Sequence, residues 1–301
     1  MRRKQRPALL AQRHGLDPAR LRLPPDGTWA TVRDHLVERL PRVAPERIDA
    51  MLAEGAVHDL TGPLAPDAAY VPGSSVWFHR DPPDEVPVPF DIRVVHRDDA
   101  ILVVDKPHFL ATIPRGSHVV ETALVRLRTG LGLPHLSPAH RLDRVTAGLV
   151  MFVVDPALRG KYQTMFKDRV VRKEYEAVAP HDPALELPRT VTSRIVKVKG
   201  VITAQEVPGP PNAETRVELV GYRGGWARYR LLPSTGRTHQ LRLHMASLGV
   251  PIRNDDFYPV LREKPLDDFR DPLQLLAKVL EFTDPVTGEH RRFTSGLELA
   301  L

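Results

Sequence analysis

Residues 140–149 read HRLDRVTAGL and place one carboxylate, Asp143, among cationic side chains immediately before the apolar run at residues 149–154. A carboxylate near guanidinium groups stays ionised at neutral pH, and the edge of a buried strand restricts its access to water. Gly148 permits an unusual backbone angle where the loop becomes a strand. Asp143 is therefore a candidate nucleophile. The alternative, for an isolated motif of this kind, is a salt-bridged aspartate that caps a turn.

A second informative cluster covers residues 236–249 and reads GRTHQLRLHMASLG. Its apolar residues recur at helical spacing, and Gly249 followed by a proline is a stop signal. The pattern predicts a short helix that begins near Thr238, where a helix N-terminus and two guanidinium groups would attract an anion. The predicted first turn carries four polar side chains: Arg237, His239, Gln240 and Arg242. An amphipathic helix with a solvated, charged face is the alternative.

Three segments, taken in order, resemble the successive signature motifs of the RluA-type pseudouridine synthase family. They are residues 140–149, residues 173–177 (KEYEA) and residues 236–244. Residues 98–107 resemble the strand that opens the family's catalytic domain, and residues 275–285 resemble its closing strand, so the resemblance covers roughly residues 91–301. The chain departs from the family pattern at Ala147, where Ser is usual, and at residues 254–258, which replace a Gly-Asp step that leads to a Tyr.

The resemblance implies a reaction and three catalytic residues. Family members break the bond between ribose and uracil nitrogen 1, rotate the base and rejoin it through carbon 5, with no cofactor or metal. Asp143 matches the essential aspartate, and Tyr175 matches the tyrosine that stacks on the flipped uracil. Arg242 matches the arginine that pairs with and orients the catalytic carboxylate. Whether Asp143 adds to the sugar, adds to the ring or promotes elimination stays open.

Further side chains in these motifs are expected to contact the RNA substrate. Arg141 would fill the space that the base vacates or bind a phosphate, with a solvated surface arginine as the alternative. Leu243 and Ile101 would line an apolar uracil pocket. Without the resemblance, Tyr175 would be a core aromatic of a strand. The expected substrate-binding residues are Arg141, His140, Thr146, Arg237, His239, Gln240, Leu243 and Lys173.

Composition limits the classes of protein to consider. The 301 residues, 42% of them hydrophobic, suffice for one larger and one smaller domain. No cysteine is present, which excludes disulfides and thiol catalysis and favours a cytoplasmic protein. His140, His239 and His244 lack the companion ligands of a zinc site, so we expect no metal. No apolar run reaches membrane-spanning length, and the charged N-terminus lacks the apolar core of a signal peptide.

The net charge of +6 suits a polyanionic partner such as RNA. Residues 1–20 carry six basic side chains against Asp17 alone, which accounts for five of the six charges. We therefore expect residues 1–24 to form a basic arm that is disordered when free.

A proline-rich segment, residues 81–89 (DPPDEVPVP), predicts a stiff linker between two domains. Before it, helical patterns at residues 31–40 and 45–54 and a strand at 71–78 predict a small α+β domain over residues 25–85. This order is similar to the small RNA-binding domain that often precedes catalytic domains of the family. Acidic residues lie among the basic residues of its helices, so we interpret it as a degenerate relative of that RNA-binding domain.

Residues 86–301 are expected to form the catalytic domain. Strand patterns separated by turns, with a tight hairpin at residues 223–225, imply antiparallel pairing. They predict an α+β fold around a mixed or antiparallel sheet with flanking helices and loops. The expected strands cover residues 92–95, 101–104, 149–154, 175–179, 191–198, 214–222, 227–232 and 275–282.

The sequence thus predicts a monomeric RNA pseudouridine synthase, an isomerase acting on ribosomal or transfer RNA. One alternative is a catalytically inactive RNA-binding protein of the same fold. A hydrolase that uses Asp143 on a glycosidic bond is less consistent with the motifs, because such enzymes usually need a second carboxylate and none recurs near them.

Overall fold

The computed structural model describes residues 9–301. The chain splits into two compact units, one that ends at Pro83 and one that runs from Asp84 to Leu301. The predicted linker is therefore shorter than expected. Glu85 accepts hydrogen bonds from three backbone N–H groups of residues 119–121, and Val88 is buried in the core of the larger unit. Glu85 and Val88 therefore anchor residues 84–89 to the larger unit.

The smaller unit consists of β1 (Ala19–Arg22), α1 (Val32–Arg39), α2 (Pro45–Ala53) and β2 (Ser75–Phe78). Thr31 and Asp34 form a reciprocal capping box at the start of α1, and a proline opens α2, so both helices begin close to their predicted positions. The basic arm predicted for residues 1–24 is shorter in the structure, because its last part forms β1. This strand pairs with β2, and Leu23 is fully buried, so residues 19–23 are part of the small unit. Residues 1–8 of the predicted arm lie outside the described residues.

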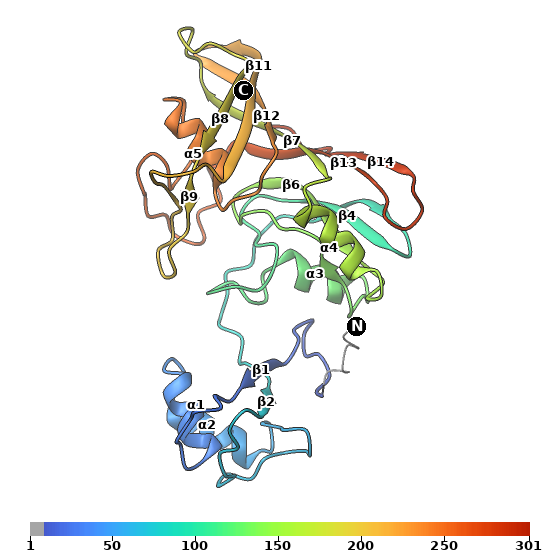
Figure 1. The fold of residues 1–301 in the computed structure, drawn as a ribbon, viewed down its shortest axis with the longest axis vertical. Coiled ribbons are helices and arrows are strands. Elements are labelled where there is room, and N and C mark those ends of the chain that lie inside the picture. The colour runs from blue at the N-terminus through green and yellow to red at the C-terminus, as the bar shows by residue number, and fades with distance from the viewer. Residues whose placement is uncertain (1–8) are drawn as a thin grey trace. The chain divides into compact units, whose positions relative to one another are not determined.

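The larger unit contains the remaining elements, most of which Figure 1 labels. They are β3 (Arg93–Arg97), β4 (Ile101–Lys106), α3 (Ala123–Gly130), β5 (Ser137–Pro138), β6 (Ala147–Val153), α4 (Arg159–Lys167), β7 (Arg172–Pro180), β8 (Arg189–Ser193), β9 (Ile195–Val196), β10 (Gln205–Glu206), β11 (Ala213–Arg223), β12 (Trp226–Pro233), α5 (Gln240–Ser247), β13 (Leu275–Thr283) and β14 (His290–Thr294).

One large sheet organises this unit, with strand order β3-β4-β6-β13-β7-β12-β11-β8, to which β14 and β5 add at β13 and β6. Only the β13–β6 pair is parallel, so the sheet is mixed and mainly antiparallel, and the predicted α+β fold is confirmed. The late strand β13 lies between β6 and β7. This insertion brings the loop before β6 close to β7, which matters because these two places carry the candidate catalytic residues.

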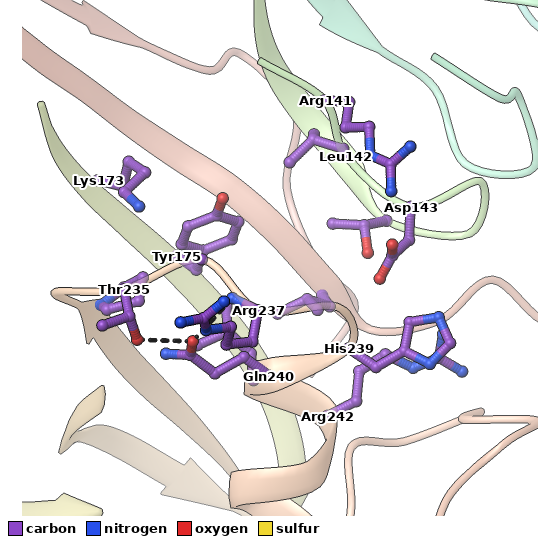
Figure 2. A pocket seen from close by; sticks show the side chains of 15 residues that line it. Arg141, Leu142, Asp143, Lys173, Tyr175, Thr235, Arg237, His239, Gln240 and Arg242 are labelled. Atoms are coloured by element: carbon purple, nitrogen blue, oxygen red, sulfur yellow. Dashed lines mark hydrogen bonds between the residues drawn. The ribbon is translucent and has the colours of Figure 1, made fainter. Parts of the chain in front are cut away.

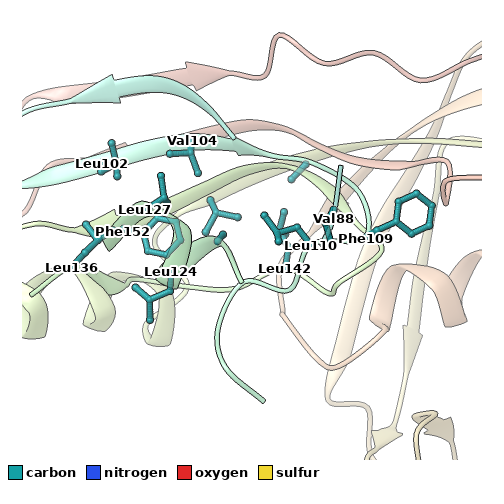
Figure 3. Close-up of a cluster of buried hydrophobic side chains, with 13 residues drawn as sticks. Val88, Leu102, Val104, Phe109, Leu110, Leu124, Leu127, Leu136, Leu142 and Phe152 are labelled. Carbon is teal, nitrogen blue, oxygen red and sulfur yellow. The ribbon is translucent and has the colours of Figure 1, made fainter. Parts of the chain in front are cut away.

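Strands β4 and β6 are buried on both faces, as their continuous apolar runs predict. Leu102 and Val104 pack with Leu124 and Leu127 of α3 in the cluster that Figure 3 shows. Ile101 faces the opposite way, into a cluster that includes Tyr162 and Met165 of α4. The predicted role of Ile101 in lining a uracil pocket is therefore wrong, because strand alternation turns its side chain toward α4.

Gly148 permits the close approach of β6 and β13. Its φ is +108°, and a Cβ at this position would lie 2.3 Å from the carbonyl oxygen of Ala277. We expect Gly148→Ala to lower the free energy of unfolding by at least about 2 kcal/mol, because the backbone contact leaves no room for a methyl group. Denaturant unfolding measures the change. The control is Gly160→Ala in α4, where the added Cβ meets nothing within 4 Å. Equal losses in both variants would contradict this explanation.

Candidate active site

A pocket of about 110 Å³ lies where the loop before β6, the strand β7 and the segment from the end of β12 into α5 converge (Figure 2). This volume is well below the roughly 300–1,000 Å³ of sites that enclose drug-sized ligands, so it suits a single small group. The lining residues are Arg141, Leu142, Asp143, Thr146, Lys173, Tyr175, Pro233, Thr235, Gly236, Arg237, His239, Gln240, Leu241, Arg242 and Leu275.

Nine of the eleven site residues predicted from the sequence line this one pocket. They come from three segments that are about 30 to 100 positions apart in the chain and that the β13 insertion helps to bring together. The nine are Asp143, Tyr175, Arg242, Arg141, Thr146, Arg237, His239, Gln240 and Lys173.

The other two predicted residues, His140 and Leu243, do not line the pocket. His140 Nε2 accepts a hydrogen bond from the backbone N–H of Met151 at 3.1 Å, and its ring stacks on Phe166. Burial lowers the pKa of His140 to about 3, so the ring is neutral and supports β6. Leu243 packs in a cluster with Tyr258 and is not among the lining residues. Both side chains are therefore used in packing within the fold, and the structure does not bring them to the pocket with the other nine.

The loop that presents Asp143 is held by the segment that follows β4. The Thr112 hydroxyl donates to the carbonyl of Leu142 at 2.8 Å and accepts from its N–H at 3.1 Å. The fully buried Lys106 donates to the carbonyl of Arg144 at 3.2 Å and to two carbonyls of its own segment. Backbone groups on both sides of Asp143 are therefore fixed by side chains, which limits the positions that its carboxylate can adopt.

Sequence reasoning missed these supporting residues. Burial lowers the pKa of Lys106 to about 7, whereas the negative charge of Asp143 acts in the opposite direction. The available signal was a lysine that ends the buried strand β4, two residues after the apolar run 101–104, because a buried ammonium group needs nearby acceptors.

Arg242 is paired differently from the prediction. Its side chain is 1% exposed, and its Nε and Nη2 donate to the two carboxylate oxygens of Asp255 at 2.7 and 2.5 Å. The sequence suggested Asp143 as this bidentate partner, and the structure corrects the assignment to Asp255. The third nitrogen, Nη1, is buried and has no hydrogen-bond partner among residues 9–301. A buried donor without a partner is costly, so this atom is a natural contact for a substrate or for Asp143.

The residues around Arg242 explain how Asp255 can pair with it. Asn254 adopts a positive φ of 63°, a conformation that glycine favours and asparagine tolerates, so it can stand where the family usually has Gly. The guanidinium also lies over the rings of Phe257 and Tyr258, 4.6 and 5.5 Å from their centroids. Burial alone would lower the pKa of Arg242, but hydrogen bonding and attraction to Asp255, with a further contribution from Asp143, raise it.

Tyr175 and Lys173 lie two residues apart on β7 and line the pocket from the same face of the strand. Burial raises the pKa of Tyr175, and the negative charge of Asp143 adds to the effect. The phenol therefore stays protonated near neutral pH and can donate a hydrogen bond. Burial also lowers the pKa of Lys173, and the charge of Arg169 contributes.

The charges that line the pocket are unbalanced in favour of cations. Asp143 is its only acidic lining residue, and four lining residues are arginine or lysine. The charge of Arg242 is neutralised by Asp255. Arg141, Lys173 and Arg237 have no carboxylate within salt-bridge distance in the part of the chain that the structure describes. A pocket of this kind attracts polyanions such as a nucleic-acid backbone.

The helix that follows starts later than the sequence predicted. α5 begins at Gln240, and His239 precedes it with a left-handed φ of 57° and no side-chain cap. The side chains of Arg237 and His239 therefore belong to the connection from β12, not to a first helical turn. His239 Nδ1 lies 2.9 Å from the hydroxyl of Tyr258, which fixes the ring at the edge of the pocket.

No cluster of three or more His, Cys, Asp or Glu side chains suited to a metal ion occurs within residues 9–301. Across the same residues, no helix has the length and apolar character needed to cross a membrane.

The sequence is similar to those of known proteins. Residues 100–247 match the family described as RNA pseudouridylate synthase. The dual-specificity RNA pseudouridine synthase RluA of Haemophilus influenzae is 30% identical over 219 residues, which cover 68% of this chain and 92% of that protein. Human pseudouridylate synthase RPUSD2 is 34% identical over 181 residues, and the chain spans 33% of its length.

A solved structure agrees on the fold. Human RNA Pseudouridylate Synthase Domain Containing 4 superposes with a TM-score of 0.51 and 23% identity, covering 69% of this chain and 88% of that one. Together with the extent of the match to RluA, this likeness leads to one conclusion: the chain belongs to the RluA-type family of RNA pseudouridine synthases, which are isomerases acting on RNA.

Proposed function

We propose that this protein isomerises specific uridines in ribosomal or transfer RNA to pseudouridine, with Asp143 as the catalytic carboxylate. The observation that carries the proposal is the composition of the pocket. One acidic side chain, Asp143, lies among cations, with a protonated phenol and a buried guanidinium beside it. A base that enters so small a space must leave the helical stack, which is how enzymes that act on bases reach their target atoms.

The proposed reaction assigns a role to each catalytic group. The bond between ribose C1′ and uracil N1 breaks, and its electron pair leaves with the base. The carboxylate of Asp143 stabilises or captures the electron-poor sugar carbon. After the base rotates, C5 bonds to C1′ and displaces the carboxylate where that has bonded to the sugar, the C5 hydrogen leaves as a proton, and N1 takes up a proton. Tyr175 stacks on the base, and Arg242, through its unpaired Nη1, orients Asp143 or a base oxygen.

The remaining lining residues bind the RNA around the target nucleotide. The cations at Arg141, Lys173 and Arg237 contact phosphates, while the polar side chains of Thr146, His239 and Gln240 shape the pocket. His140 and Leu243 act through packing, the first against Phe166 and the second with Tyr258. We further propose that the enzyme needs no metal or organic cofactor and acts as a cytoplasmic monomer, since the reaction is redox-neutral and the chain has no cysteine.

The smaller unit fits a degenerate RNA-binding domain. Two of its helical arginines are neutralised, Arg33 by Asp49 and Arg47 by Asp81, so they are less available to phosphates. We therefore propose that the larger unit supplies most of the affinity for RNA.

The experiment that tests the function uses ribosomal and transfer RNA transcripts whose uridines carry tritium on C5. Isomerisation releases this tritium into water, because the new glycosidic bond forms at C5. We expect the full-length chain to release tritium from at least one transcript and to release no free uracil. Tight RNA binding without tritium release would favour the inactive RNA-binding alternative, and free uracil would indicate a nucleosidase.

A further inference from the structure

Gln240, at the inner wall of the pocket, is buried and uses all of its hydrogen-bonding capacity. Its Oε1 accepts from the hydroxyl of Thr235 at 2.7 Å, a contact that Figure 2 shows, and from the backbone N–H of Arg237 at 3.0 Å. Its Nε2 donates to the carbonyl of Glu214 and to the hydroxyl of Thr215, both at 2.9 Å. Because a backbone N–H only donates and a carbonyl only accepts, these contacts fix the orientation of the amide.

The hydrogen bonds continue away from the pocket through two strands. Nδ1 of His244 lies 2.9 Å from the Thr215 hydroxyl, and its Nε2 lies 3.0 Å from the hydroxyl of Ser193 on β8. Thr215 and His244 are both completely buried. The Thr215 hydroxyl accepts from Gln240, so its own proton points to His244 Nδ1. His244 then carries its proton on Nε2 and donates to Ser193.

This pattern requires a neutral imidazole at position 244. A second ring proton would face the Thr215 hydroxyl, whose proton would then have no acceptor among residues 9–301. Burial lowers the pKa of His244, whereas Glu206, with an oxygen 3.9 Å from Nε2, acts in the opposite direction.

We propose that His244 and Thr215, which do not line the pocket, are positioning residues for RNA binding. The chain Ser193–His244–Thr215–Gln240 connects β8 and β11 to the amide that holds the backbone of Arg237. Arg237 has no carboxylate partner among residues 9–301, and its Nε donates to the carbonyl of Asn212 at 3.1 Å, so the hydrogen-bond chain helps to set where its guanidinium binds a phosphate. This inference rests on the proposed function, because it names the residues that shape the same RNA site.

This hydrogen-bond chain should affect RNA binding more than cleavage of the glycosidic bond, because other contacts hold the catalytic groups in place. Asp143 lies on the loop held by Lys106 and Thr112, and Tyr175 lies on β7. Arg242 is on α5 between Gln240 and His244, but its guanidinium is held by the carboxylate of Asp255. Loss of this hydrogen-bond chain should therefore raise KM for RNA, while kcat changes little. General destabilisation would instead reduce the active fraction and lower the apparent kcat.

The test compares Thr215→Val with Thr215→Ser in the full-length protein. Valine keeps the shape of threonine but removes the hydroxyl, whereas serine keeps the hydroxyl and loses the methyl group. Since a buried hydrogen bond contributes on the order of 1 kcal/mol, two lost contacts should raise KM for a substrate RNA about 30-fold in the valine variant. The serine variant should stay within about twofold of wild type. The exposed Thr192→Val on β8 is the control and should leave KM unchanged.

Each other outcome overturns the proposal. An unchanged KM in Thr215→Val would show that the hydrogen-bond chain does not position the residues that bind RNA. An equal rise in KM for the valine and serine variants would assign the effect to packing of the methyl group. A lower kcat with unchanged KM, together with a lower unfolding midpoint, would assign it to stability. If the wild-type protein releases no tritium, the proposed function fails. The equilibrium Kd of the Thr215 variants for the same RNA then still tests whether the hydrogen-bond chain positions the RNA site.

Discussion

Asp143→Asn should slow pseudouridine formation by at least about 10,000-fold, as substitutions of this kind do for other essential carboxylates. Asparagine has nearly the same shape, but it carries no negative charge to stabilise or capture an electron-poor sugar carbon. RNA affinity should be retained or slightly increased, because the variant removes the only acidic side chain from a cationic pocket. Single-turnover tritium release and the equilibrium Kd for the same RNA measure the two effects.

Asp168→Asn is a suitable control for this experiment. Asp168 is an exposed carboxylate at the end of α4 and does not line the pocket, so its loss should change neither rate nor affinity. Equal product from wild type and Asp143→Asn would remove Asp143 from the reaction. A parallel loss of RNA binding would instead indicate that Asp143 holds the fold of its loop.

Arg242→Met should have the second largest effect, on both stability and activity. It leaves the buried carboxylate of Asp255 without its bidentate partner, which costs about 3–5 kcal/mol in comparable sites. It also removes Nη1, the unpaired donor proposed to orient Asp143 or the base. We expect a clear fall in the unfolding midpoint and loss of tritium release.

A second substitution separates these two effects. Adding Asp255→Asn to Arg242→Met removes the uncompensated charge and should recover much of the stability, since buried ion pairs can be replaced at little net cost. Tritium release should not recover if Arg242 acts on the reaction. Recovery of both stability and activity in the double variant would show that Arg242 is only structural.

The sequence predicted those parts of the fold that depend on local patterns. The apolar runs of β4 and β6 and the double-glycine hairpin between β11 and β12 appear where their residues indicated them. β1 was missed because two of its four residues are arginines and its pairing partner β2 lies more than 50 positions away. The insertion of β13 between β6 and β7 could not be inferred, because long-range strand order leaves no local signal.

The candidate site was predictable to a similar extent. The ordered motifs identified most of the residues that line the pocket, because segments that carry binding groups keep a recognisable spacing. The partner of Arg242 was assigned wrongly, since both Asp143 and Asp255 could reach a guanidinium and only the backbone path after α5 decides between them. The hydrogen-bond chain through Thr215 was not visible either, because β11 contributes only one isolated threonine to it.

Pseudouridine mapping in cells tests the central claim most directly. Ribosomal and transfer RNA would be mapped from cells that lack the gene, and from the same cells expressing either wild type or Asp143→Asn at equal levels. We predict that at least one pseudouridine disappears with the gene, returns with wild type and stays absent with Asp143→Asn. Identical maps in all three strains, or full restoration by Asp143→Asn, would contradict a uridine isomerase that depends on this carboxylate.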